Sequence, residues 1–165
     1  MTAASVTIAA VYYIMMLRMN QRNGRITLTN SIMQSLTSEE AIGTWLELMH
    51  MEWSDYDDFE RKYGSDFNPK LAAKRLSFWA TCDSLGHLLR TKVVDVETLY
   101  YSGVSYTWWP WLKFAPIMEE HRRRYVGPSA YRNWEYLAHE MERVSKRLNP
   151  AFTVPSSFDS YVPDK

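Results

Sequence analysis

The feature that most constrains the fold of this 165-residue chain is an uncharged, largely apolar run near its N-terminus. The run covers residues 2–17, reads TAASVTIAAVYYIMML, and is followed directly by Arg18. As a helix it spans about 24 Å, less than the roughly 30 Å hydrocarbon layer of a bilayer. We therefore predict a single transmembrane helix that needs a thinned bilayer, a partner, or Arg18 reaching the headgroups.

The basic residues after this run predict its orientation. Arg18, Arg22 and Arg25 all lie on the C-terminal side, so the positive-inside rule places the body in the cytoplasm and the N-terminus outside. A cleavable secretory signal is disfavoured because no small-x-small site follows the run. A buried core helix and an interfacial helix are the alternatives. The predicted contacts with lipid or a partner are Val11, Tyr12, Tyr13, Ile14, Leu17 and Arg18.

Composition limits the remaining possibilities. Hydrophobic residues make up 46% and charged residues 23%, which with the length suits one globular domain plus an appendage. The formal net charge is zero, so no whole-molecule field draws the protein to nucleic acid. Cys82 is the single cysteine, which excludes an intramolecular disulfide and the usual multi-thiolate zinc sites.

Residues 23–148 are predicted to form a helical body, because helical spacing recurs and no useful β-alternation appears. The first helix either continues past Gly24 or breaks there. Gly86, inside a predicted long helix, suggests the close approach of a neighbouring helix. Helix starts are indicated by Thr37 with Glu40, Ser54 with Asp57, Asn68-Pro69, Asp95 and Gly127-Pro128.

These patterns predict an all-α fold with a single N-terminal transmembrane helix followed by a bundle of about five helices. The predicted division is residues 1–22 as anchor and basic flank, 23–148 as the bundle, and 149–165 as an extended tail. Pro and Ser residues after Asn149 indicate the tail.

Three stretches carry a resemblance to a known family. They are WSDYDDFERKYGSDFNP at residues 53–69, GHLLR at 86–90 and NWEYLAHEM at 133–141. Together they resemble an uncharacterised bacterial and archaeal family, a domain of unknown function with membrane-anchored helical members. The resemblance implies an N-terminal transmembrane helix, a short basic stretch and helices rich in Trp and acidic residues. It implies no activity, cofactor or catalytic residue.

Two side-chain pairs have spacings known from functional sites. Glu47 and His50 form a Glu-x-x-His motif, as di-iron bundles require, but a solvated helix face is the favoured interpretation because no second such motif exists. Asp83 lies one turn from His87 and next to Cys82, yet adjacent positions point about 100° apart. A structural Asp83 to His87 contact is therefore favoured over thiol chemistry, with Cys82 in the core.

Charged and aromatic clusters leave further alternatives open. Residues 39–66 hold nine acids against two bases, and residues 122–124 are three arginines. Intramolecular pairing and solvation are favoured over docking to a basic partner or to phosphate. Trp108, Trp109 and Trp111 are either a core plug or a surface that contacts the membrane or a partner.

The prediction for function follows from the anchor. We expect a membrane-anchored, non-enzymatic accessory subunit whose partners are the lipid bilayer and other membrane proteins, with no cofactor, no metal and no nucleic acid. The alternatives are a metal-binding or enzymatic bundle using Glu47 and His50 or Asp83 and His87, and a soluble bundle without membrane contact.

Overall fold

A computed structural model describes residues 3–151 and residue 153, and within them the chain is entirely helical. This confirms the predicted all-α class. The predicted extended tail lies, apart from 149–151 and 153, outside the described residues. The helices are α1 (Ala3–Leu36), α2 (Glu39–Met49), α3 (Tyr56–Tyr63), α4 (Pro69–Arg90), α5 (Val96–Tyr101), α6 (Trp109–His121) and α7 (Arg132–Leu148). A 3₁₀ helix, Ser105–Trp108, precedes α6, and a π-helix, Arg122–Val126, follows it.

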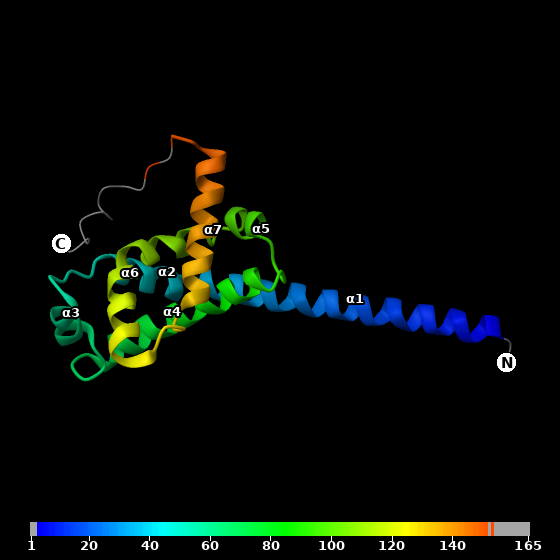
Figure 1. Ribbon diagram of the computed structural model, residues 1–165, viewed down its shortest axis with the longest axis horizontal. Coiled ribbons are helices and arrows are strands. Elements are labelled where there is room, and N and C mark those ends of the chain that lie inside the picture. Colours follow the sequence, from blue (N-terminus) through cyan, green and yellow to red (C-terminus); the bar gives the residue numbers. More distant parts are fainter. Residues whose placement is uncertain (1–2, 152, 154–165) are drawn as a thin grey trace.

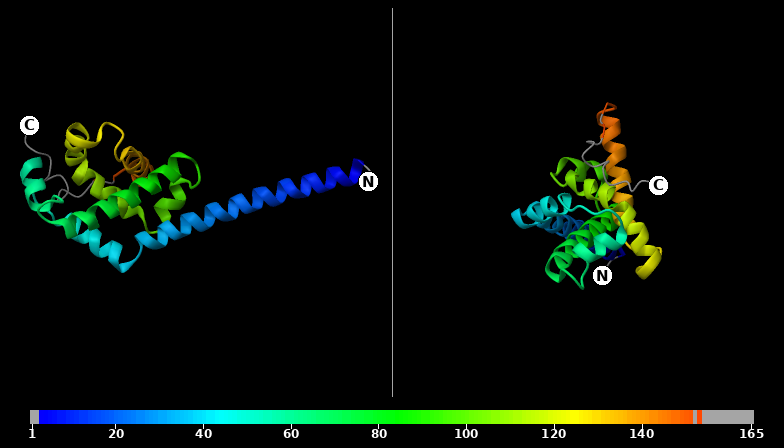
Figure 2. Two further views of the ribbon diagram at one scale, coloured as in Figure 1. Left: turned by 90° about the horizontal axis from the view of Figure 1, so that it is seen from below. Right: turned by 90° about the vertical axis from the view of Figure 1, so that its left-hand side faces the viewer.

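The molecule has two parts of different shape. Helices α2 to α7 gather into a compact body, and α1 projects from it as a single long rod (Figure 1). The views in Figure 2 agree that only the C-terminal end of α1 reaches the body. Among the α1 side chains whose burial is described, which begin at Ile8, the first buried one is Thr29, and Leu36 at the end of the helix belongs to the core.

Helix α1 runs through Gly24 without a break, so of the two sequence-based alternatives the continuous helix is correct. It ends at Leu36, where the Thr37 hydroxyl donates to the carbonyl oxygen of Met33 at 3.1 Å. Ser38 then caps α2 by accepting a hydrogen bond from the amide of Ala41. The predicted cap at Thr37 is therefore wrong by one residue, because α2 begins at Glu39 and the residue directly before it is Ser38.

Local capping chemistry explains the other helix starts in the body. Asn68 and Asp95 cap α4 and α5 as predicted, and Pro69 occupies the first turn of α4. The start of α3 differs by one residue, since the cap is Asp55 and not Ser54. The Asp55 carboxylate accepts from the amide of Asp58 at 2.8 Å.

The core forms where α4 crosses α7, the most extensive contact between helices in the body. Gly86 makes this crossing possible, because a Cβ there would lie 2.0 Å from the carbonyl oxygen of Asn133. The predicted close approach at Gly86 is confirmed. Trp79, Phe114 and Trp134 fill the space around the crossing, and the indole of Trp134 donates to the carbonyl oxygen of Thr107.

Helix α7 begins later than predicted. Residues 127–131 form a turn, and the helix starts at Arg132 and not at Gly127-Pro128. Its N-terminus is capped from another helix, because the Asp83 carboxylate of α4 accepts from the amides of Asn133 and Trp134, both at 3.0 Å. A cap supplied from 50 residues away leaves no local signal in the sequence.

Candidate membrane-contact surface

The exposed part of α1 is the most unusual surface of the molecule. Every side chain from Ile8 to Leu28 is exposed, and this stretch makes up more than half of the helix. Large apolar residues are concentrated in the first part of this stretch. They are Ile8, Val11, Tyr12, Tyr13, Ile14, Met15, Met16 and Leu17.

Apolar side chains surround this part of α1 on all sides. Six consecutive residues, 12–17, are large and apolar, and at 100° per residue they cover the full circumference of the helix. An amphipathic helix that packs on a body, or lies flat at an interface, has one apolar face and one polar face. The segment therefore offers no polar face to water.

The next part of α1 is basic. Arg18, Arg22 and Arg25 are exposed, and within the described chain no ion pair is formed with any of them. The first acidic residue of the sequence is Glu39. The guanidinium groups therefore have no carboxylate on their own helix to neutralise them.

Intrinsic propensity gives little support to this exposed rod. Gly24 and several β-branched residues lie in it, and helices with little tertiary packing are marginal in water.

Judged by length and hydropathy, none of the helices in the described part of the chain qualifies to cross a membrane. The predicted transmembrane span thus stays a prediction.

Two tryptophans of the cluster lie in the core of the body. Trp108 is 2% exposed and Trp111 is 5% exposed, and Trp111 packs edge-on against Trp134 at 5.3 Å between ring centroids. The prediction that these two side chains contact the membrane or a partner is wrong, and the alternative of a core plug is correct for them. Trp109 is half-buried and meets Trp108 edge-on at 6.2 Å.

Glu47 and His50, the candidate metal pair, each contact another group of the protein. The Glu47 carboxylate forms an ion pair with Lys74 of α4 at 2.8 Å. Nδ1 of His50 lies 2.7 Å from the carbonyl oxygen of Leu46, one turn back on its own helix. Among the described residues no group of three or more His, Cys, Asp or Glu side chains converges on one point. Glu47 therefore serves to join α2 to α4.

The predicted contact between Asp83 and His87 gives way to a different role for the carboxylate. Both oxygens of Asp83 accept hydrogen bonds from the start of α7, including one from the side-chain amide of Asn133 at 3.1 Å. His87 is exposed on the same helix.

Cys82 lies fully in the core, where burial raises the pKa of its thiol well above the ordinary value. The predicted core position of Cys82 is confirmed.

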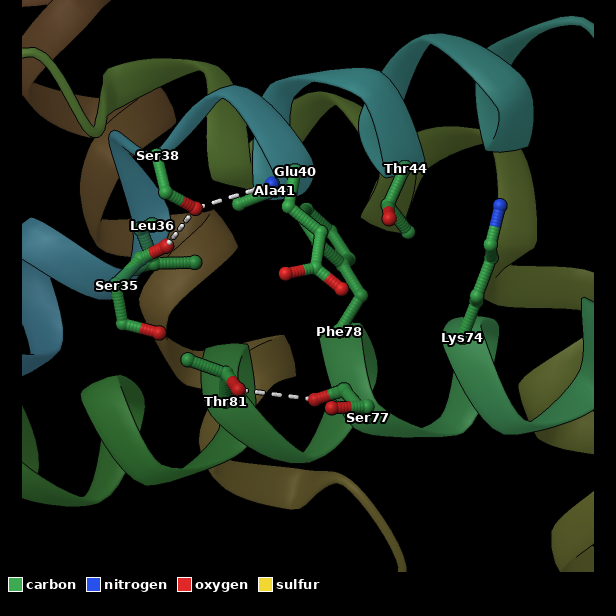
Figure 3. A pocket seen from close by; sticks show the side chains of 10 residues that line it. All are labelled: Ser35, Leu36, Ser38, Glu40, Ala41, Thr44, Lys74, Ser77, Phe78 and Thr81. Carbon is green, nitrogen blue, oxygen red and sulfur yellow. Dashed lines mark hydrogen bonds between the residues drawn. The ribbon is translucent and has the colours of Figure 1, made fainter.

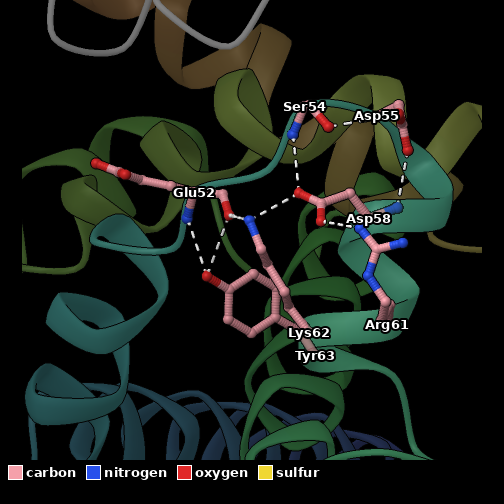
Figure 4. Close-up of polar contacts among 7 residues, drawn as sticks. All are labelled: Glu52, Ser54, Asp55, Asp58, Arg61, Lys62 and Tyr63. Carbon is pink, nitrogen blue, oxygen red and sulfur yellow. Dashed lines mark hydrogen bonds and ion pairs between the residues drawn. The ribbon is translucent and has the colours of Figure 1, made fainter.

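The acidic segment is paired internally at several points. Arg124 reaches Asp57 at 2.6 Å, which joins the acidic segment to the arginine cluster as the favoured interpretation predicted. In Figure 4 the Asp58 carboxylate lies between Lys62, Arg61 and the amide of Ser54. Hydrogen bonds from Lys62 and Ser54 lower the pKa of Asp58 to about 2. The Asp58 carboxylate stabilises the turn between α2 and α3.

A groove of about 200 Å³ lies between the end of α1, α2 and α4 (Figure 3). Glu40 points into it from α2, and Lys74 lies at one end. The Ser38 and Thr81 hydroxyls are each bonded to a carbonyl one helical turn away, as small hydroxyl residues often are. The Lys74 amine at the groove is paired with the Glu47 carboxylate at 2.8 Å.

Sequence reasoning missed a buried cation in α4 and another in α6. Arg75, 5% exposed, lies between the rings of Phe59 and Trp79, at 4.7 and 4.4 Å from their centroids. Burial lowers the pKa of Arg75. Lys113, 1% exposed, donates to the carbonyl oxygen of Met49 in the last turn of α2. Both hold helices together through contacts with rings or carbonyls.

A third polar contact was also missed. The Tyr56 hydroxyl lies 3.0 Å from Nδ1 of His121, which joins α3 to the end of α6. Burial, then the charge of Glu60, raises the pKa of Tyr56, while burial lowers the pKa of His121. The contact links two helices that are 65 residues apart in the sequence.

Within the described residues, the exposed part of α1 carries more exposed large apolar side chains than any other helix. Comparisons of the chain with protein-family models, with curated proteins and with solved structures found no match.

Proposed function

We propose that this protein is a membrane-anchored, non-enzymatic accessory subunit whose α1 helix enters a bilayer and packs against other membrane proteins. The observation that carries the proposal is the exposure of apolar side chains around the whole circumference of α1 from Ile8 to Leu17. Burying one such side chain is worth roughly 1.5–3 kcal/mol, so leaving all of them in water is costly.

Length supports a subunit and not an independent anchor. From Ala3 to Leu17 the helix covers about 22 Å, less than the roughly 30 Å hydrocarbon layer. A short apolar helix is stabilised in lipid by local thinning or by neighbouring helices. Packing beside the longer helices of another membrane protein would provide such neighbouring helices. With Arg18 on the inner side, the N-terminus is outside and the body is cytoplasmic.

Membrane attachment is tested by extraction with alkaline carbonate. The full chain is expected in the membrane pellet, and the double variant Val11→Asp/Ile14→Asp is expected in the supernatant, because each Asp near the centre of a span costs about 3 kcal/mol. The matched control is Ile42→Asp/Leu46→Asp on α2. Those two side chains are 42% and 46% exposed, close to the 52% and 49% of Val11 and Ile14.

The control separates attachment from general damage, since it changes apolar exposure equally but leaves α1 intact. Release of the unmodified chain into the supernatant would overturn the proposal. The subunit role is tested by purification in mild detergent. A co-purifying membrane protein that is lost from the α1 double variant supports it, whereas a lone monomer contradicts it.

A further inference from the structure

We infer that the arginine face of α1, defined as Arg18, Arg22 and Arg25, binds anionic phospholipid headgroups and holds the acidic body away from the bilayer. The inference rests on the proposed membrane attachment of α1 and names the lipid that this attachment requires. Its basis is the position, spacing and lack of ion-pair partners of the three guanidinium groups.

The three side chains form one face. At 100° per residue, Arg22 lies about 40° and Arg25 about 20° from the direction of Arg18, so all three fall within an arc of about 60°. All are exposed, and in the described chain none takes part in an ion pair. The three guanidinium groups therefore lie on one side of the helix, and binding an anion would not require them to break an ion pair.

Their depth matches the headgroup layer. Arg18 follows Leu17 directly, and Arg22 and Arg25 lie about 7.5 and 12 Å beyond Leu17 along the axis. Each headgroup layer is about 5–7 Å thick. Helical side chains lean toward the N-terminus, which here is toward the membrane, and the long arginine stem extends this reach. Guanidinium groups bind phosphate and carboxylate in a bidentate manner.

Charge is divided sharply along the chain. The first 38 residues contain three arginines and no acid, whereas the rest contains 16 basic and 19 acidic residues, a net charge of −3. A surface rich in anionic lipid attracts the first part and repels the second. An arginine face at the junction therefore distinguishes anionic from neutral lipid.

The rod keeps these two effects apart. Thr29, where α1 first becomes buried, lies about 18 Å beyond Leu17 along the axis. Charges are largely screened beyond about 8 Å at physiological salt. The body thus lies outside most of the field that attracts the arginines, and attraction at α1 is not cancelled by repulsion of the body.

The test is a vesicle titration with the full chain. One set of vesicles is phosphatidylcholine alone, and the other contains roughly 30% phosphatidylserine. Each arginine near an anionic surface contributes about fivefold to binding, so we expect a preference on the order of 100-fold for the anionic vesicles in low salt, shrinking as salt rises. The variant Arg18→Gln/Arg22→Gln/Arg25→Gln is expected to lose this preference but to keep binding to phosphatidylcholine.

The matched control removes three bases from α7, Arg143→Gln/Lys146→Gln/Arg147→Gln. These bases are also exposed, but each is paired with a glutamate, so the control makes the same change in net charge away from α1. It is expected to keep the preference for anionic vesicles. Equal loss in the control would overturn the inference, because net charge alone would then explain the effect.

The outcomes separate the two proposals. Equal binding of the unmodified chain to both vesicles overturns the arginine face as a headgroup site but leaves membrane attachment standing. No binding to either vesicle overturns both. If lipid preference is absent and the chain instead binds immobilised polyglutamate through the arginines, the face serves an acidic protein surface and the inference is wrong.

Discussion

The exposed part of α1 and the crossing of α4 with α7 differ in how their sequences are constrained. At the crossing, each side chain meets several others, and Gly86 leaves room for the backbone of Asn133 only because it lacks a Cβ. In α1, an added Cβ at Gly24 would meet nothing within 4 Å. Glycine is therefore essential for packing in α4 and has no packing role in α1.

The difference is largest for bulky aromatic residues. We expect Trp134→Ala to lower the free energy of unfolding of the body by about 4–5 kcal/mol, because a fully buried indole and its hydrogen bond to Thr107 are lost. Tyr12→Ala removes a comparable ring from α1 and is expected to leave body stability unchanged. Denaturant unfolding followed by tryptophan fluorescence measures this, since no tryptophan lies in α1. A similar loss in both variants would remove the distinction between the regions.

The same substitution at two glycines is expected to destabilise the body in one case and to favour the α1 helix in the other. Gly86→Ala places a Cβ against backbone atoms of Asn133 and is expected to destabilise the body by about 3 kcal/mol. Gly24→Ala is expected to leave the body unchanged and to increase the helicity of α1, with a gain of about 1 kcal/mol in helix propensity. Far-ultraviolet circular dichroism and denaturant titration report the two effects. Destabilisation by Gly24→Ala would mean that α1 has a contact near that position.

The cap of α7 should matter more than the exposed histidine beside it. Asp83→Ala removes the acceptor for two backbone amides and the Asn133 side chain, and we expect a loss of about 2 kcal/mol. His87→Ala, one turn away on the surface, is expected to change stability by less than about 0.5 kcal/mol. Equal losses in thermal unfolding would restore the predicted partnership of Asp83 with His87.

A buried lysine gives an effect that depends on pH. Burial lowers the pKa of Lys113 from 10.5 to about 8, so the folded state disfavours the charged amine more than the unfolded state does. The cost is present in full below pH 8 and is relieved as the pH rises toward 10.5. Lys113→Met is expected to remove the rise in stability over that window, measured as unfolding midpoints against pH. An unchanged pH profile would show that Lys113 stays charged in the fold.

Much of the body could be predicted from local signals. Asn68-Pro69 and Asp95 act within a few residues, so their helices begin where the sequence indicates. Gly86 was informative because glycine inside a long helix needs a reason, and here the reason is packing. The caps at Ser38 and Asp55 were missed by one residue, since a neighbouring hydroxyl offers the same chemistry.

Other features depend on contacts distant in the sequence. Helix α7 is capped by Asp83 from α4, and no residue near Arg132 indicates that start. Arg75 had a local signal that was overlooked, because it fills the gap in the apolar stripe between Leu71 and Phe78. Its burial is stabilised by the rings of Phe59 and Trp79 and by a hydrogen bond to the carbonyl oxygen of Tyr63.

The candidate site divides in the same way. The apolar run and the arginines that follow it are continuous in sequence, so the surface of α1 could be predicted directly. The tryptophans at Trp108 and Trp111 have a composition that suits core and interface equally. Trp111 is covered by Trp134 and Arg122, which approach from α7 and the π-helix.

Insertion of α1 into a bilayer is measured by comparing the surroundings of Ile14 and Ile42, whose side chains are similarly exposed. A fluorescent probe is attached to Ile14→Cys in α1 or to Ile42→Cys in α2, and the native Cys82 does not interfere because it is fully buried. With vesicles present, the probe at position 14 is expected to shift to shorter emission wavelengths and to be quenched by lipid-borne quenchers, while the probe at position 42 keeps its aqueous spectrum. An aqueous spectrum at both positions would contradict the account.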